Sequence, residues 1–200
     1  MDTLPIFPLG TVLFPGGVLP LRIFEARYMD MARECLKTDS AFGVCLITRG
    51  NEVGQPADHE AQGCLAMIRE WDMPQLGLLR IRTVGSQRFE ILQRELQADG
   101  LIRAQIRLLA ADPELPVPAP FGMLPQLVQR IVTDLVEEEE DPLKRMIADP
   151  YRYDDAAWVG NRLSEFLPLS MATRQRLMTL TDPLLRLSLI QQVLEQHQAL

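Results

Sequence analysis

Lysine is nearly absent from this sequence. Lys37 and Lys144 are its two lysines, although lysine and arginine together number 20 in 200 residues. A nucleotide-binding loop of the form G-x-x-x-x-G-K-[ST] needs a lysine directly after a glycine, where it reaches the β- and γ-phosphates. Neither lysine follows a glycine. The sequence therefore excludes this kind of ATPase site.

Histidine and paired cysteines are also scarce. His59 and His197 are single and far apart, and the sequence has no H-E-x-x-H run and no C-x-x-C pair, so we expect no metal site and no cofactor. A G-x-S-x-G nucleophile elbow is missing too. Cys35, Cys45 and Cys64 each lie in an apolar pattern. They indicate reduced core thiols in a cytoplasmic protein.

Long apolar runs and a basic surface are missing as well. No uninterrupted apolar stretch approaches the roughly 20 residues that cross a bilayer. The first residues, Met1 to Thr3, carry no basic region of a signal peptide, so we expect neither a membrane span nor a secretory signal. The net charge of −7 disfavours binding to nucleic acid, which generally needs a basic face.

The stretch from Leu4 to Leu36 predicts two short strands that lead into a helix. Its prolines cannot donate ladder hydrogen bonds and so indicate edge or bulged strands, while Pro15-Gly16-Gly17 predicts a turn. A 3.6-residue apolar period that begins at Tyr28 predicts an amphipathic helix near residues 25–37. We expect later strands to cover the apolar side chains before the helix, which are Val12, Phe14, Val18, Leu19, Leu21 and Ile23.

The pattern up to residue 112 predicts six to eight strands. Phe42–Ile47 has the composition of a buried strand, and Leu76–Val84 and Arg88–Leu92 are predicted to pair around a Gly85-Ser86-Gln87 turn. Asp99-Gly100 predicts the next hairpin turn. This many strands with one helix predict a closed or nearly closed antiparallel barrel, because closure removes exposed edges.

The second half changes to a helical period after a proline-rich linker. Four prolines between Pro113 and Pro120 favour an extended connection. A helix is then predicted over Leu124–Val136, followed by helices capped by Asp155, Ser170 and Asp182. Four helices joined by short turns predict a small bundle. The predicted fold class is α+β, with a β-barrel in residues 1–112 and a helical bundle in residues 121–200.

The opening stretch also carries a longer and more specific pattern. From Pro8 to Tyr28 its order is P-L-x-x-V-L-F-P-G-x-x-L-P-L-R-I-F-E-x-R-Y. This order resembles the start of the Lon protease N-terminal, substrate-binding domain, and in particular the free-standing bacterial proteins that contain only this domain. Gly77–Ile91 resembles the mid-domain hairpin of that family, and Trp158–Leu187 resembles its C-terminal helices. The resemblance covers essentially the whole chain and implies a PUA-like pseudo-barrel followed by a helical bundle.

Lon proteases also contain an ATPase and a Ser-Lys peptidase, and neither is expected here. Nothing around Lys37 or Lys144 resembles the peptidase motif, and the phosphate-binding loop is missing. The resemblance therefore implies a non-catalytic module that binds unfolded or apolar polypeptide, as an adaptor or regulator beside a separate protease. Its expected partners are polypeptide substrates or that protease, and a homodimer is left open.

Two groups of residues are candidates for binding. One is the opening stretch and the other is the region near Trp71, because recognition of apolar peptide needs an exposed apolar groove. Around the predicted strand-to-helix junction, an Arg–Glu pair would either line such a groove or tie the helix to the barrel, and we favour the second interpretation. The candidate residues are Phe14, Pro15, Val18, Arg22, Glu25, Arg27, Tyr28 and Trp71.

Two other functions are compatible with a PUA-like barrel. One is RNA binding by a basic stripe of Arg80, Arg82, Arg103 and Arg107, which the overall acidity disfavours. The other is small-molecule binding, because a Lon-like domain also occurs beside the ligand-binding domain of cereblon. Nothing in this sequence resembles that separate ligand-binding domain.

Overall fold

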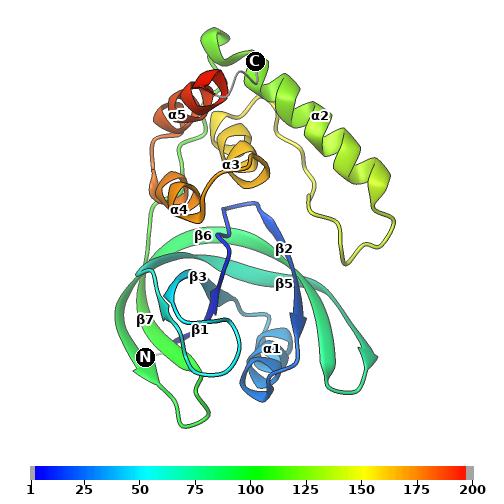
Figure 1. The fold of residues 1–200 in the computed structure, drawn as a ribbon, viewed down its shortest axis with the longest axis vertical. Coiled ribbons are helices and arrows are strands. Elements are labelled where there is room, and N and C mark those ends of the chain that lie inside the picture. The colour runs from blue at the N-terminus through cyan, green and yellow to red at the C-terminus, as the bar shows by residue number, and fades with distance from the viewer. Residues whose placement is uncertain (1–2, 197–200) are drawn as a thin grey trace.

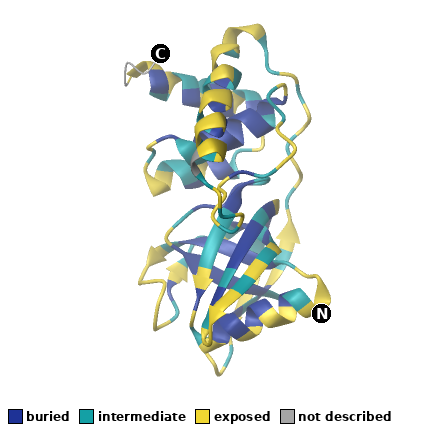
Figure 2. Cartoon of the chain, turned by 90° about the vertical axis from the view of Figure 1, so that its right-hand side faces the viewer, coloured by how far each residue is buried: buried dark blue, intermediate teal, exposed yellow. Residues whose placement is uncertain are grey.

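The structure, a computed structural model, describes residues 3–196. His197 and the end of the predicted helical part lie outside the described residues. The strands gather in one half of the molecule and helices α2 to α5 in the other, with α1 at the opposite end of the barrel (Figure 1). Buried residues fill the inside of both halves (Figure 2).

The strands form a ring. In chain order they are β1 (Leu4–Leu9), β2 (Val18–Ile23), β3 (Phe42–Arg49), β4 (Asp58–His59), β5 (Gln62–Gln75), β6 (Leu78–Leu96) and β7 (Ile102–Leu108). Their order is β1-β7-β6-β5-β3, and β1 also pairs with β3, which closes the ring. The β1–β3 pair is parallel, whereas the other pairs are antiparallel. The predicted pseudo-barrel is confirmed.

The predicted hairpin turn at Gly85 is wrong. β6 runs unbroken from Leu78 to Leu96 and passes straight through this glycine, and its hairpin with β5 turns at Leu76-Gly77 instead. Gly85 is needed for a different reason. A Cβ atom there would lie 2.1 Å from the backbone oxygen of Phe14, so the glycine allows another segment to pack closely on the strand.

That segment is the loop between β1 and β2, residues 10–17. The predicted turn is confirmed: Gly16 has a φ of 72°, and its N–H donates to the Gly85 carbonyl over 2.8 Å. The expected cover is partly wrong, because Val12 and Phe14 pack in the apolar cluster of the helical half. Ile23 does pack with side chains of β3, β5 and β6, and Leu19 and Leu21 pack against the same cluster, as expected.

The helices follow the predicted caps. α1 (Ala26–Thr38) buries one apolar stripe against the barrel. After a short 3-10 turn, η1 (Ala119–Phe121), come α2 (Met123–Glu138), α3 (Ala156–Phe166), α4 (Met171–Thr179) and α5 (Pro183–Gln196). Asp155 accepts from the Trp158 N–H and Ser170 from the Thr173 N–H. No helix in residues 3–196 is long and apolar enough to cross a membrane.

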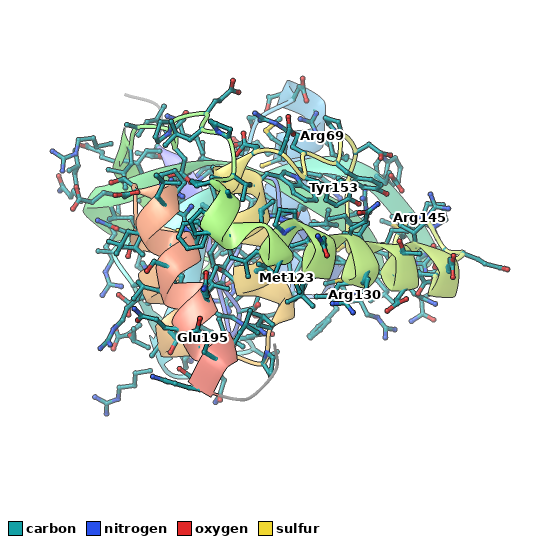
Figure 3. All side chains as sticks on the ribbon, turned by 90° about the horizontal axis from the view of Figure 1, so that it is seen from above. Arg69, Met123, Arg130, Arg145, Tyr153 and Glu195 are labelled. Atoms are coloured by element: carbon teal, nitrogen blue, oxygen red, sulfur yellow. The ribbon has the colours of Figure 1, made fainter. Side chains whose placement is uncertain are left out.

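One helical connection is much longer than predicted. Residues 139–155 join α2 to α3 without a helix and pass along the outer face of the barrel, where Arg82 donates to the carbonyls of Arg145 and Ile147. Figure 3 shows α2, which carries Met123 and Arg130, with Arg145 of this connection labelled beyond it in the view from the helical end. The connection therefore forms a second contact between the two halves.

Candidate functional site

The β5–β6 hairpin ends in exposed apolar side chains. Trp71 is 57% exposed and Leu76, in the turn, is 98% exposed. Met73 lies between them, and Phe24 follows directly after Ile23, the last β2 residue paired with β6. We call Phe24, Trp71, Met73 and Leu76 the hairpin-end patch. Scattered apolar residues are ordinary on protein surfaces, but a group at one place indicates a binding surface.

Sheet geometry explains why the patch is uncovered. Trp71 is paired directly with Ile81, so both side chains point to the same face of the sheet. Ile81 is 1% exposed because it belongs to the cluster that packs on α1. Trp71 lies on this face but is not a member of that cluster. The inner face of the sheet thus continues beyond the segment that covers it.

A groove lies beside β2. It has a volume of about 290 Å³ and is lined by Phe7, Leu9, Leu21, Phe24 and Val53, with other β2 and α1 residues. Within the described strands, β2 pairs with β6 alone, so one strand edge faces the groove. Phe24 lines the groove, and β6 pairs with both β2 and β5, so the groove and the hairpin-end patch lie on neighbouring strands. The groove and the hairpin-end patch together form the candidate functional site.

The predicted junction residues lie at this groove. Arg22, Glu25 and Tyr28 line it, and Phe7 stacks on the Tyr28 ring with centroids 3.9 Å apart. Burial raises the pKa of Tyr28, so its hydroxyl remains protonated at neutral pH. Arg22 is exposed and is therefore accessible to a ligand in the groove.

Arg27 is buried and holds the start of α1 in place. Its guanidinium lies 2.8 Å from the Glu25 carboxylate and donates to the carbonyls of Gly54 and Gly100 over 2.8 and 3.1 Å. It also lies 4.6 Å from the Tyr28 ring centroid. Arg27 therefore ties the helix to two loops, which is the arrangement favoured from the sequence.

Three other candidates lie apart from the groove. Phe14 is 0% exposed and Val18 is 5% exposed, and neither lines the groove, so a contact with a ligand on the surface is incompatible with their positions. Pro15 is half-buried, and its carbonyl accepts a hydrogen bond from Arg162. The helical half packs on the loop that contains Phe14 and Pro15. The prolines and glycines of the loop predict its turn but do not predict that the helices bury it.

Sequence reasoning missed Phe24, Val53, Met73 and Leu76 in the site. The exposure of Leu76 could have been predicted, because a leucine next to the glycine of a tight turn is rarely buried. Phe24 lies four residues before Tyr28 and is in step with the apolar stripe, but α1 begins only at Ala26, so the helical period does not decide whether Phe24 is buried. Val53 had no such signal, since it lies in a loop whose position depends on the fold.

The contact between the two halves is built from buried charges. Arg88 binds the Asp112 carboxylate through both Nη atoms, at 2.7 and 2.8 Å, and Arg186 of α5 reaches the same carboxylate at 2.9 Å. Burial opposes ionisation of Asp112, but the two arginines outweigh it and hold the pKa of Asp112 below its ordinary value. We call Arg88, Asp112 and Arg186 the joint triad.

A second buried pair binds the loop that precedes β2. Arg162 of α3 is 0% exposed; it donates to the carbonyls of Pro15 and Gly16 and lies 3.0 Å from the Glu165 carboxylate. Burial raises the pKa of Glu165 to about 7, although the charge of Arg162 acts in the opposite direction. Sequence patterns show an i, i+3 pair here but not its burial.

The proposed basic stripe is neutralised by carboxylates. Arg80 pairs with Asp72 and Asp141, and Arg82 pairs with Glu70. Arg103 and Arg107 pair with Glu34 and Glu90 in the same way. Arginines that already have carboxylate partners do not offer free charge to phosphates, so the structure gives the RNA interpretation no support.

The described residues contain neither a cluster of metal ligands nor a reactive thiol. No group of three or more histidine, cysteine, aspartate or glutamate side chains is close enough to hold a metal ion within residues 3–196. Cys35, Cys45 and Cys64 are buried free thiols. Burial raises the pKa of each, which suppresses the reactive thiolate.

Comparisons with known proteins agree with this fold and give the family. Residues 3–196 match the ATP-dependent protease La (LON) substrate-binding domain. The crystal structure of a Lon N-terminal domain protein from Xanthomonas campestris is 33% identical, with a TM-score of 0.75, and the match covers 95% of this chain and 97% of that chain. The N-terminal domain of Mycobacterium avium complex Lon protease has a TM-score of 0.58 at 16% identity, covering 94% and 96% of the two chains, which shows the fold alone.

Curated relatives are longer proteins. A Lon protease from Parabacteroides distasonis is 26% identical over 184 residues, which are 90% of this chain and 22% of that protein. Cereblon from Danio rerio is 29% identical over 137 residues, 66% of this chain and 30% of that protein. The chain thus spans less than a third of the length of these relatives. The resemblance found in the opening stretch is confirmed, and the chain belongs to the family of the Lon substrate-binding domain.

Proposed function

We propose that this chain is a non-catalytic module that binds unfolded or apolar polypeptide, and that it acts in the cytoplasm as an adaptor or regulator of proteolysis. The observation that carries the proposal is the hairpin-end patch, where Trp71 and Leu76 are 57% and 98% exposed, together with the groove beside the neighbouring β2. The family is described as substrate-binding, and the substrate of an associated protease is polypeptide.

The shape and charge of the site fit an extended apolar segment. Phe24 and Val53 offer apolar surface along the groove, and Arg22 and Glu25 lie on its walls with opposite charges. Such a site would hold a peptide mainly by burial of apolar surface, and its affinity would depend little on salt. An RNA-binding surface would lose affinity steeply with salt as counterions are released.

A titration at two ionic strengths tests the proposal. We expect an unfolded apolar model polypeptide to bind with similar affinity in low and high salt, and a structured RNA to bind weakly at both. Trp71→Ser together with Leu76→Ser should abolish polypeptide binding. A matched control is Leu185→Ser, which changes an exposed leucine on α5. Salt-sensitive RNA binding, or polypeptide binding unaffected by the double substitution, would contradict the proposal.

The non-catalytic part of the proposal has its own test. The sequence encodes no phosphate-binding loop, and the matched domain accounts for residues 3–196. We expect the purified chain neither to hydrolyse ATP nor to cleave casein. Activity that co-purifies with the chain and changes with substitutions in it would refute this expectation.

A further inference from the structure

The groove beside β2 is lined by an unbroken run of that strand. Pro20, Leu21, Arg22 and Ile23 all line it. Successive side chains of a strand point to opposite faces of the sheet, so side chains alone do not bring a continuous run to one groove. What these residues share is the main-chain edge of the strand. The groove therefore follows the edge of β2 that has no partner among the described strands.

Two hydrogen bonds show which main-chain groups point away from this edge. The Gly17 carbonyl accepts from the Gly85 N–H over 2.8 Å, and the Leu19 carbonyl accepts from the Thr83 hydroxyl over 2.9 Å. Gly85 and Thr83 belong to β6. Residues of a strand direct their main-chain groups alternately to its two edges. Every second residue from Gly17 onward therefore faces β6, and the residues between them face the other edge.

The open edge offers two acceptors and one donor to the groove. These are the carbonyl of Pro20 and the carbonyl and N–H of Arg22, and pairing among the described strands leaves all three unused. Proline has no N–H, so Pro20 fits a position that does not face β6. Unpaired main-chain groups along a strand edge are a template for another strand.

The other walls of the groove suit the side chains of an extended segment. Phe7 and Leu9 of β1 line the groove together with Tyr28 of α1, and Val53 is 55% exposed beside them. A second copy of this chain would bring its own Pro20, which lacks a donor, to the same short edge. A proline-free segment of another polypeptide can use all three main-chain groups, so it is the better occupant.

We propose that a bound polypeptide adds to the open edge of β2 as a short strand. The groove then recognises main-chain groups and accommodates apolar side chains of alternate residues. This inference rests on the proposed function and deepens it, because it defines the substrate class as extended, proline-free segments. A helical segment uses its main-chain groups internally and would leave the edge unpaired.

Hydrogen exchange of the full, 15N-labelled chain tests the proposal from the side of the protein. The probe is an acetylated and amidated six-residue peptide of alternating valine and threonine. We expect the Arg22 N–H to exchange fast in the free chain and at least about tenfold more slowly at saturating peptide, because a main-chain hydrogen bond forms. The N–H groups of Leu21 and Ile23 face β6 and should exchange slowly in both states.

Two N-methylated forms of the peptide test the pairing from the side of the ligand. One is methylated at the valines and the other at the threonines, so each loses the donors of one edge. With the valines facing the apolar wall, only one peptide edge can face β2. We expect one pattern to weaken binding at least about tenfold, through lost hydrogen bonds and steric overlap, and the other to bind like the parent. The pattern that weakens binding gives the direction of the bound strand.

A pair of substitutions at one position sharpens the test. Arg22→Pro removes the edge donor without removing a bond to β6, and should weaken the peptide at least about fivefold. Arg22→Ala removes only an exposed side chain and should change the affinity by at most about twofold. If Arg22→Pro does not fold, the N-methylated peptides on the unaltered chain still decide.

The possible failures separate this inference from the proposed function. Equal effects of the two methylation patterns, or unchanged exchange at Arg22 while peptide is bound, would overturn strand addition and leave polypeptide binding intact. Failure of the six-residue peptide to bind, while the unfolded apolar polypeptide does bind, would have the same meaning. Failure of both to bind would overturn the inference and the proposed function together.

Discussion

The hairpin end and the contact between the two halves place polar and apolar side chains in opposite ways. At the hairpin end, large apolar side chains are exposed. At the contact, the residues Arg88, Arg162 and Arg186 are at most 2% exposed. The difference lies in whether the chain itself supplies the partner. The buried arginines meet carboxylates and carbonyls of this chain, whereas the hairpin-end patch is left for another molecule.

The largest expected effect comes from breaking the joint triad. Asp112→Ala would leave Arg88 and Arg186 buried without their carboxylate, so we expect a loss of about 3–5 kcal/mol in the free energy of unfolding, measured by urea denaturation. Because the triad joins the two halves, we expect them to unfold in one transition before the substitution.

The control for this substitution is a pair of similar geometry at the surface. Asp72→Ala breaks the contact with Arg80, which is 3.0 Å long but half-exposed, and should cost less than about 1 kcal/mol. Equal losses from the two substitutions would contradict the role given to burial.

A smaller loss is expected from Gly85→Ala. The added Cβ would lie 2.1 Å from the Phe14 carbonyl oxygen, so backbone at the contact between the halves must move, at a cost of about 2–3 kcal/mol. Gly77→Ala in the hairpin turn has open space around it and a φ of 83°, and should cost about 1 kcal/mol through backbone strain alone. Thermal unfolding of both variants measures the difference. A larger loss of stability in Gly77→Ala than in Gly85→Ala would contradict the close packing of the loop on Gly85.

The pH dependence of stability tests Glu165. Its pKa is raised by burial to about 7, so between the pKa of an unfolded glutamate and pH 7 the folded chain binds this proton more strongly than the unfolded chain does. The free energy of unfolding should therefore fall as pH rises through this window, on the order of 2 kcal/mol, and level off above it.

Glu165→Gln should remove that slope, because glutamine does not titrate. Urea denaturation of both forms at several pH values between 5 and 8 provides the measurement. If the substituted chain keeps the full slope, another group is responsible for it.

The smallest effect on stability is expected at the hairpin end. Leu76→Ser changes a side chain that is 98% exposed, so the free energy of unfolding should change by less than about 0.5 kcal/mol. Thermal unfolding checks this directly. A loss above about 1 kcal/mol would mean that the residue is covered in solution, for instance by a second copy of the chain, and light scattering would then identify the dimer.

Local patterns predicted most of the fold but little of the contact between its halves. The caps at Asp155 and Ser170 and the stripe of α1 depend on neighbouring residues, and they were found. A glycine within a strand pattern indicates either a turn or a close approach. The loop at Phe14 decides between these for Gly85, and it lies about 70 residues away in the chain.

The site was predicted in part for the same reason. The region near Trp71, three residues before Pro74, was one of the two regions proposed for binding from the sequence, and Trp71 is 57% exposed. Asp112 stands at the start of the proline-rich linker, where no local pattern indicates a buried charge. Its arginine partners are 24 and 74 residues away in the chain. A single sequence shows no pairing at that separation. The buried charges were therefore not predicted, and of the exposed apolar residues only those near a local turn, such as Leu76, carried a signal in the sequence.

The closed ring has a consequence for the order of folding. β1 pairs with β7, and Leu4 lies opposite Ala104, so during synthesis β1 has to wait for a partner that is made about 100 residues later. At typical rates of about 5–20 residues per second, that wait lasts about 5–20 s. During it, the apolar β1 can meet only β3. The nascent chain therefore carries an open sheet edge of the kind that chaperones protect.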